Sequence, residues 1–171
     1  MPKYEEVVTG KLKVHKLREI DIADLLGRKE VRLDQTSLQS NIDGKTILVT
    51  GAGGSIGSEL CRQIARFSPA RLLLLGHGEN SIYLIHKELL AQYGDKVEIV
   101  PLIADIQDRE RIFHIMHEYQ PDRVYHAAAH KHVPLMEYNP TEAVKNNIYG
   151  AKNVAEAAKA AGVAKFVMVS T

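Results

Sequence analysis

A glycine-rich turn at residues 50–57 is the stretch of this sequence that points most directly to a chemistry. It reads Thr-Gly-Ala-Gly-Gly-Ser-Ile-Gly and follows directly on an apolar run. In such a turn Gly51 permits the tight bend, Gly54 lets the backbone approach a pyrophosphate, and Gly57 lets the next helix pack closely. The start of that helix offers free N–H groups and its positive dipole end to phosphates. The turn therefore predicts a dinucleotide site, and the residues assigned to it are Gly51, Gly54, Ser55, Ile56 and Gly57.

The residues after the second expected strand leave the choice of coenzyme open. An enzyme that binds NAD usually carries an acidic residue about 20 positions after the glycines, where it bonds the ribose 2′-hydroxyl. Here the sequence reads Gly76-His77-Gly78-Glu79. Glu79 is a candidate for the ribose and His77 for a 2′-phosphate, whereas a flexible turn would explain the same residues without a cofactor. We assign His77 and Glu79 to the cofactor site and expect NAD or NADP, with NAD favoured.

Two later strand ends supply the remaining cofactor candidates. Asp105 and Ile106 follow the third expected strand, where a carboxylate can accept from the adenine amino group and the next N–H can donate to the ring. Ligands of parallel sheets collect at this edge. The rival role for Asp105 is in a loop or at a helix start, but Asp108 is better placed as the helix N-cap. Ala127 and Ala128 end the fourth strand with small side chains, which leaves room for ribose and nicotinamide.

Three histidines near the fourth strand, His126, His130 and His132, do not predict a metal centre. Their spacing puts one in a strand and two in a loop, with no cysteine or acidic cluster beside them. Protein zinc sites instead gather cysteine, histidine and carboxylate ligands at characteristic spacings. We therefore expect no metal site.

The elements that position these residues alternate along the chain from Lys45 onward. Uninterrupted apolar runs, typical of strands buried on both faces, predict strands at 46–50, 72–75, 97–102, 123–128 and 165–170. Helical spacing of apolar residues predicts helices over 56–67, 82–93, 112–119 and about 140–161. This alternation predicts a parallel sheet with right-handed crossovers. The expected fold is α/β, a Rossmann-type doubly wound parallel sheet truncated after the fifth strand.

The first 44 residues are expected to form a separate polar lead-in. Residues 20–26 are compatible with one helical turn, and Val31 with Leu33 with a short extended piece, but no apolar period continues. A complete enzyme of this type needs more sheet and a substrate domain. We therefore expect a lead-in at 1–44 and an NAD(P)-binding Rossmann domain at 45–171, the N-terminal part of a longer catalytic domain.

The composition restricts the class of protein and its surroundings. The 171 residues are 45% hydrophobic and 25% charged with a net charge of +1, which gives no reason to expect a nucleic-acid partner. The single cysteine, Cys61, fits a reducing compartment and is expected to be a small buried residue on a helix. No run approaches the roughly 20 apolar residues that cross a bilayer, and no signal peptide is evident. We expect a cytoplasmic polypeptide that makes no membrane contact of its own.

Several motifs together resemble the CapD-type polysaccharide biosynthesis proteins of the extended short-chain dehydrogenase/reductase superfamily. They are Asp-Leu-Leu-Gly-Arg at 24–28, the stretch 50–60, and His-Ala-Ala-Ala-His-Lys-His-Val-Pro-Leu-Met-Glu at 126–137. The resemblance extends over roughly residues 20–171. Proteins of this family are nucleotide-sugar 4,6-dehydratases that typically act on UDP-N-acetylglucosamine.

The resemblance implies a redox cycle with a tightly held cofactor. Hydride leaves sugar C4 for the nicotinamide, water is lost across C5–C6, and hydride returns to C6, while the protein positions and polarises. It also implies that Lys131, His132 and Val133 line the sugar side of the pocket, and that Thr171 hydrogen-bonds the sugar. The acid–base pair of the family would follow Thr171, so this fragment is expected to bind cofactor without turnover. Full-length relatives often carry N-terminal membrane helices, which places their catalytic part on the cytosolic face.

Other functions stay open beside the dehydratase. They are an epimerase or reductase of the same superfamily, a non-catalytic NAD(P) sensor, and an interaction fragment whose glycines only form a turn. In that last case residues 131–137 would be no more than a helix start at Pro134. A homo-oligomer is also expected, because the long helix carries small residues on two faces, one for the sheet and one for a second copy. These residues are Ala143, Ala151, Ala155, Ala157 and Ala158.

Overall fold

The computed structural model describes residues 34–170, in which five parallel strands form a sheet in the order β3-β2-β1-β4-β5. The strands are β1 (Thr46–Thr50), β2 (Arg71–Gly76), β3 (Glu98–Ile103), β4 (Arg123–His126) and β5 (Lys165–Met168). Thr50 at the end of β1 pairs with Leu75 of β2 on one side and with His126 of β4 on the other. The predicted parallel Rossmann-type α/β fold is confirmed.

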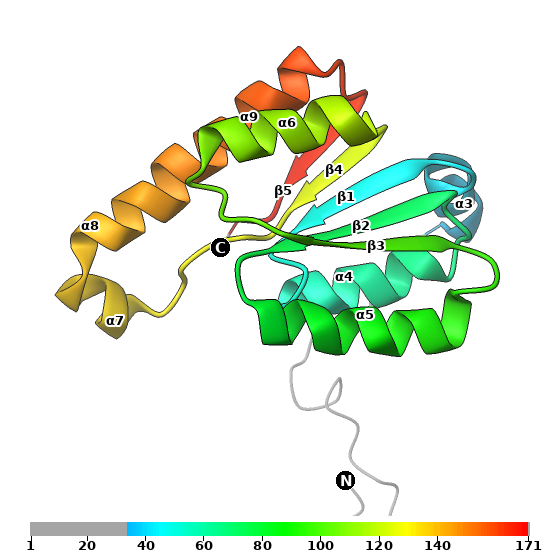
Figure 1. Cartoon of the computed structure of the whole chain (residues 1–171), viewed down its shortest axis with the longest axis horizontal. Helices are drawn as coiled ribbons and strands as arrows, with labels where there is room; N and C mark the ends of the chain where they lie inside the picture. Colours follow the sequence, from blue (N-terminus) through cyan, green and yellow to red (C-terminus); the bar gives the residue numbers. More distant parts are fainter. Residues whose placement is uncertain (1–33, 171) are drawn as a thin grey trace, which may run out of the picture. The chain divides into compact units, whose positions relative to one another are not determined.

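Helices cover both faces of this sheet (Figure 1). On one face lie α4 (Ser55–Ala65) and α5 (Glu79–Tyr93), and on the other α6 (Arg109–Tyr119) and α9 (Ala151–Ala160). The buried apolar side chains accordingly divide into two cores. Cys61 of α4 belongs to the first core, where burial raises the pKa of its thiol to about 12.

Local capping explains where α6 begins and ends. The side chain of Asp108 accepts a hydrogen bond from the N–H of Arg111 at 3.0 Å, which confirms the predicted N-cap. Gln120 takes a left-handed conformation with φ 44°, and Pro121 follows it, so the helix cannot continue.

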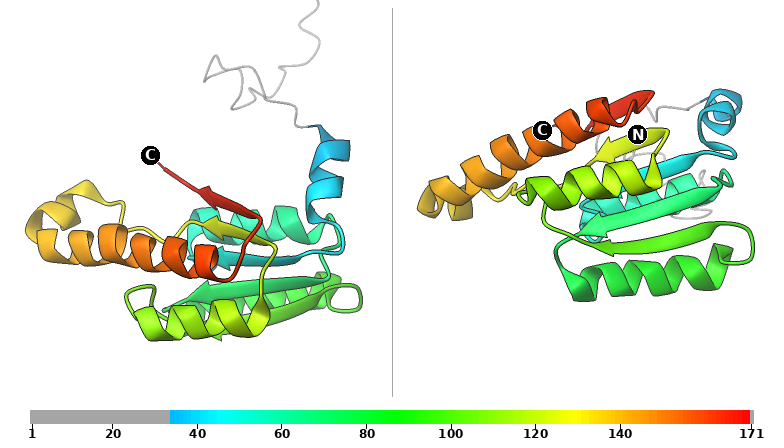
Figure 2. Two further views of the ribbon diagram at one scale, coloured as in Figure 1. Left: turned by 90° about the horizontal axis from the view of Figure 1, so that it is seen from above. Right: turned by 45° about the horizontal axis from the view of Figure 1, so that its top comes forward.

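The long helix predicted from about residue 140 is continuous but not uniform. It runs through α8 (Pro140–Ala143), a π-helix η1 (Val144–Gly150) and α9, and it follows the short helix α7 (Val133–Tyr138). Figures 1 and 2 agree that the α8 and η1 half projects beyond the carboxyl ends of the strands. Apolar spacing predicts a helix but not its hydrogen-bond register, so the π-helical segment was not expected.

Two predicted strands end earlier than expected. The fourth strand was predicted to reach residue 128 and the fifth residue 170, but β4 ends at His126 and β5 at Met168. The N–H of Ala127 still donates to the carbonyl oxygen of Thr50 at 3.2 Å, and the residues after it line a pocket, described below. Apolar composition alone does not mark where the strand ends.

The helix α3 (Gln35–Ile42) was not predicted. Asp34 caps it by accepting from the N–H of Thr36 at 3.1 Å, and Ile42 is its only buried residue, so it has no apolar period to detect. The helical turn predicted at 20–26 and the extended piece at Val31 and Leu33 lie outside the described residues. The boundary between lead-in and domain at residue 44 stays a prediction. Among residues 34–170, no helix is long and apolar enough to cross a membrane.

Candidate functional site

A pocket of about 250 Å³ opens at the carboxyl ends of the strands, where β1 lies between β2 and β4. The chain order of the strands reverses at this point, and open parallel sheets bind their ligands there. Four strand-end loops and η1 contribute the lining, which is Gly51, Gly53, Gly54, Leu75, Gly76, His77, Gly78, Ser81, Ala104, Ile106, Ala127, Ala128, Ala129, His130 and Asn146.

The glycines of the turn are required by close backbone contacts. Gly51 has φ +67°, and a Cβ there would lie 2.8 Å from the carbonyl oxygen of Ala127 and from the backbone of Ala128. A Cβ at Gly57 would overlap the carbonyl of Gly51. The N–H of Gly54 donates to that same carbonyl at 2.9 Å, and Gly54 is the N-cap of α4. The turn thus brings the start of α4 to the pocket with its backbone exposed.

Six of the residues assigned to the cofactor line this pocket: Gly51, Gly54, His77, Ile106, Ala127 and Ala128. The other five do not line it: Ser55, Ile56, Gly57, Glu79 and Asp105. Ser55 and Ile56 form the exposed first turn of α4, and Glu79 is the exposed first residue of α5. The carboxylate of Asp105 is also exposed and accepts from the N–H of Gln107 at 2.9 Å.

Several lining residues were not found from the sequence. A Cβ at Gly53 would overlap the side chain of Ser81, so the first turn of α5 packs directly on the glycine turn. Asn146 is only 5% exposed and reaches the pocket from η1. Neither Ser81 nor Asn146 belongs to a recognisable motif, and each is far in sequence from the loop it meets.

A second pocket of about 180 Å³ adjoins the first and shares Ala127, Ala128, Ala129 and His130 with it. Its other lining residues are His126, Lys131, Asn147, Met168, Val169 and Ser170. Of the residues expected on the sugar side, Lys131 lines this pocket, whereas His132 is the N-cap of α7 and Val133 its first residue. Thr171 lies outside the described residues.

A buried polar pair joins the ends of the neighbouring strands β1 and β4 at the pockets. Thr50 Oγ1 and His126 Nδ1 are 2.7 Å apart, and both residues are nearly inaccessible to solvent. Burial lowers the pKa of His126 to about 4, so its imidazole is neutral at pH 7. In the part of the chain that the structure describes, no three histidine, cysteine or acidic side chains group as metal ligands.

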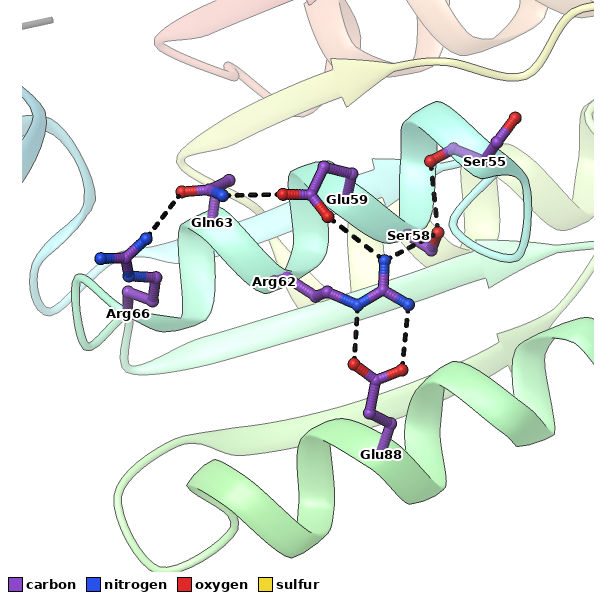
Figure 3. A network of polar contacts seen from close by, with 7 residues as sticks. All are labelled: Ser55, Ser58, Glu59, Arg62, Gln63, Arg66 and Glu88. Carbon is purple, nitrogen blue, oxygen red and sulfur yellow. Dashed lines mark hydrogen bonds and ion pairs between the residues drawn. The ribbon is translucent and has the colours of Figure 1, made fainter. Parts of the chain in front are cut away.

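An ion pair ties together the two helices that begin at the first pocket (Figure 3). The Nε and Nη2 of Arg62 on α4 donate to the two carboxylate oxygens of Glu88 on α5, at 2.6 and 2.9 Å. These hydrogen bonds lower the pKa of Glu88 below its usual range. The pair joins the last turn of α4 to the second half of α5, and the N-caps of these two helices, Gly54 and Gly78, line the pocket.

Comparison with known proteins places this site in context. The sequence model of a family described as polysaccharide biosynthesis protein matches residues 47–171. The chain is 59% identical over 171 residues to the capsular polysaccharide biosynthesis protein CapD of Staphylococcus aureus, covering all of this chain and 28% of the relative. It is 37% identical over 134 residues to a UDP-N-acetylglucosamine 4,6-dehydratase (inverting) of Campylobacter jejuni, covering 75% of this chain and 37% of the relative.

A solved structure shares the fold. It is a UDP-glucose-4-epimerase from Stenotrophomonas maltophila with bound NAD and formylated UDP-arabinopyranose. The TM-score is 0.67 at 30% identity, over 74% of this chain and 37% of the epimerase. The chain therefore spans well under half the length of the relatives that it matches.

Proposed function

Because this chain belongs to the polysaccharide biosynthesis protein family, we propose that it forms the dinucleotide-binding part of a nucleotide-sugar 4,6-dehydratase that uses UDP-N-acetylglucosamine. One observation carries the proposal: a glycine-turn pocket at the strand reversal shares a wall with a second pocket. Redox dehydration of a sugar needs a dinucleotide and a sugar side by side, and adjoining pockets suit that arrangement. We expect residues 1–171 alone to bind the dinucleotide without dehydrating the sugar, which product analysis would test.

The residues around the first pocket suit the successive parts of a dinucleotide. The exposed backbone of Gly54 and the start of α4 suit the pyrophosphate, since N–H groups and the positive dipole end meet there. Ile106 lines the pocket beside Asp105, the residue proposed for the adenine, and the small side chains of Ala127 and Ala128 leave space proposed for the nicotinamide. When bound, the nicotinamide would accept and return a hydride; the residues of this chain hold and orient it.

The charges around the pocket favour NAD over NADP. Among residues 34–170, no lysine or arginine lines the first pocket. A 2′-phosphate beyond β2 would meet His77 and the first turn of α5, where the carboxylate of Glu79 would repel it as a like charge and oppose the favourable helix dipole. A ribose 2′-hydroxyl meets no such penalty, and Glu79 is a candidate to accept its hydrogen bond.

The second pocket is the proposed place of the nucleotide sugar. Lys131 lines it and is the described cation best placed for a diphosphate. His132 and Val133, at the start of α7, and Thr171 remain proposed substrate residues on the strength of the family resemblance alone. The similarity to a UDP-glucose-4-epimerase keeps epimerisation as a second candidate. Dehydration and epimerisation give different sugar products. Identifying the product formed by a protein as long as these relatives would therefore distinguish the two reactions.

We also propose that the protein lies on the cytosolic side and forms a homo-oligomer. In this assembly a second copy would pack against the long helix formed by α8, η1 and α9. Ala157 and Ala158 are buried in the core, so these two face the sheet, whereas Ala155 is exposed. Large apolar side chains stand out near the start of that helix: Val144 is 42% exposed, Ile148 59% and Tyr149 59%. Exposed apolar side chains in one region mark association sites. A monomeric mass by light scattering would count against a homo-oligomer.

Parallel calorimetric titrations with NAD⁺ and NADP⁺ test the cofactor assignment. We expect saturable binding of NAD⁺ and at least about tenfold weaker binding of NADP⁺, the equivalent of about 1.4 kcal/mol. The variant His77→Arg adds a cation at the rim of the first pocket and should narrow this difference by strengthening NADP⁺ binding. His114→Arg, on the exposed surface of α6, is the matched control and should leave both affinities unchanged. Binding of neither nucleotide, or tighter NADP⁺ binding by the wild-type chain, would contradict the assignment.

A further inference from the structure

The strand β3 stands at one end of the sheet, and its outer edge meets no other strand in the described part of the chain, residues 34–170 (Figure 1). On its inner side it pairs with β2 in an unbroken register from Glu98 to Ile103. The free N–H and C=O groups of such an edge form a template on which the strand of another chain can pair. The residues of β3 that point their N–H groups outward therefore decide whether this edge accepts another strand.

Two hydrogen bonds identify those outward groups. The N–H of Glu98 donates to the carbonyl oxygen of Ala70 at 3.3 Å, and the N–H of Ala104 donates to that of Gly76 at 3.1 Å. In a parallel ladder alternate residues of one strand donate to the same neighbour. The even-numbered residues from 98 to 104 thus donate toward β2, and positions 99, 101 and 103 face outward.

The middle outward position is an exposed proline, Pro101, which has no N–H group. It costs the ladder with β2 no hydrogen bond, because its nitrogen faces away from β2. On the free edge it leaves the donors of Ile99 and Ile103 separated by a position without one. A second strand cannot form consecutive hydrogen bonds across that gap. Proline within sheets is largely confined to outward positions of this kind on edge strands.

The rest of β3 favours strand pairing. It reads Glu-Ile-Val-Pro-Leu-Ile, and the side chain of Ile103 is 49% exposed. Its one charged residue, Glu98, pairs with Arg71 at 2.8 Å, so the start of the strand carries little net charge. Six-residue segments with high β-propensity, low net charge and no proline are those that stack into intermolecular sheets. Pro101 is the feature of β3 that departs from this pattern.

Exposed apolar side chains of α5 extend the same edge. α4 packs on β1 and β2, and α5 on β2 and β3, so the flank of α5 away from α4 lies toward the edge of the sheet. Glu88 marks the flank that faces α4, because it pairs with Arg62 of that helix. Tyr83 and Leu90, two turns apart on the opposite flank, are 56% and 50% exposed. A strand added to β3 would cover part of this surface and gain apolar contacts as well as backbone hydrogen bonds.

We propose that Pro101 closes the free edge of β3 to strand addition and so keeps copies of this chain from joining their sheets. The strand that it excludes is β3 of a second copy, because two such apolar edges related by a two-fold axis match each other. This role does not depend on the proposed cofactor or sugar. It is also separate from the proposed oligomer on the long helix, since α9 packs on β4 in the other half of the sheet.

Light scattering and amide hydrogen exchange of the 171-residue chain, both over a range of protein concentrations, test this block. Pro101→Val restores the N–H and keeps an apolar side chain of similar size. It should raise the mass at least about twofold above that of wild type. As the concentration rises, exchange in peptides covering 98–104 should slow by about tenfold in the variant and stay constant in wild type.

Pro134→Val is the matched control, because it replaces an exposed proline in the first turn of α7, away from any strand edge. It should leave the mass and the exchange at 98–104 as in wild type. Pro101→Thr supplies the same N–H with a polar side chain and should associate as Pro101→Val does. Adding Ile103→Lys to Pro101→Val places a charge on the opened edge and should return both readouts to the wild-type values.

Three results contradict the proposal. The first is a wild-type mass for both Pro101 variants, and the second is association without slower exchange at 98–104. The third is association of the valine variant alone, since the apolar side chain and not the N–H would then be responsible. Should Pro101→Val fail to fold, the threonine variant decides by the same two readouts.

Discussion

At the scale of single residues, the buried pair of Thr50 and His126 is an unusual use of polar groups. Both lie at strand ends at the pockets, at 0% and 2% exposure, where apolar residues would otherwise be expected. The hydrogen bond between them offsets the cost of burying two polar side chains. The buried site favours the neutral imidazole, because the charged imidazolium would lose its hydration there.

This requirement predicts a pH dependence of stability. The pKa of His126 is lowered by burial from 6.5 to about 4 in the folded chain. On acidification the unfolded chain therefore takes up the proton first. The contribution of His126 to the free energy of unfolding falls as the pH drops from about 6.5 to about 4, and it stays constant at lower pH. The full loss is on the order of 3 kcal/mol, at 1.36 kcal/mol for each pKa unit.

Urea denaturation of wild type and His126→Gln between about pH 7 and about pH 4.5 measures this effect. The variant should be less stable at neutral pH but should lose less on acidification, so the two curves approach each other. His117→Gln removes an exposed histidine of α6 and should keep the wild-type slope. A constant difference between wild type and His126→Gln at every pH would show that His126 does not titrate as described.

At the scale of elements, the pair of Arg62 and Glu88 joins α4 to α5 with two parallel hydrogen bonds, the strongest geometry for such a pair. Both side chains remain partly exposed, at 38% and 36%, so water and salt weaken their attraction. A double-mutant cycle with Arg62→Met and Glu88→Gln should give a coupling energy of about 0.5–1 kcal/mol, reduced in high salt.

Lys145 and Glu142 provide the comparison for that cycle, because they form a single-contact pair within one exposed helical stretch. Their coupling should be at most about 0.5 kcal/mol. Equal couplings for the two pairs would mean that the bidentate contact does not tie α4 to α5. Replacing Arg62 by lysine should remove most of the larger coupling, since an ammonium cannot pair with both oxygens.

The elements also show what the sequence can and cannot predict. The strands and the glycine turn were predicted because β1 and β2 are apolar on both faces and the motif lies between strand and helix. The helix α3 was missed because only Ile42 is buried. The contact of Asn147 with His130 spans 17 positions, and the packing of Ser81 on Gly53 spans two elements, so neither leaves a local pattern.

At the scale of the whole molecule, the sheet is the middle layer between two separate cores. Side chains alternate across a strand, so neighbouring residues of β2 enter different cores. Leu74 packs with residues of α4 and α5, and Leu73 with residues of α6 and α9. Figure 1 shows the two helical layers on opposite sides of the strands.

This three-layer arrangement predicts that adjacent substitutions in β2 are equally damaging. Leu73 and Leu74 are both 0% exposed, so Leu73→Ala and Leu74→Ala should each lower the free energy of unfolding by about 2–5 kcal/mol. Leu90→Ala, at a side chain of α5 that is 50% exposed, is the control and should cost about 0.5 kcal/mol or less. In a sheet covered on one face only, one of the two β2 variants would resemble this control. A loss of unfolding free energy below about 1 kcal/mol for either leucine variant would therefore show that the helices do not cover that face of the sheet. The close packing that holds the pocket loops in place would then be missing on that side.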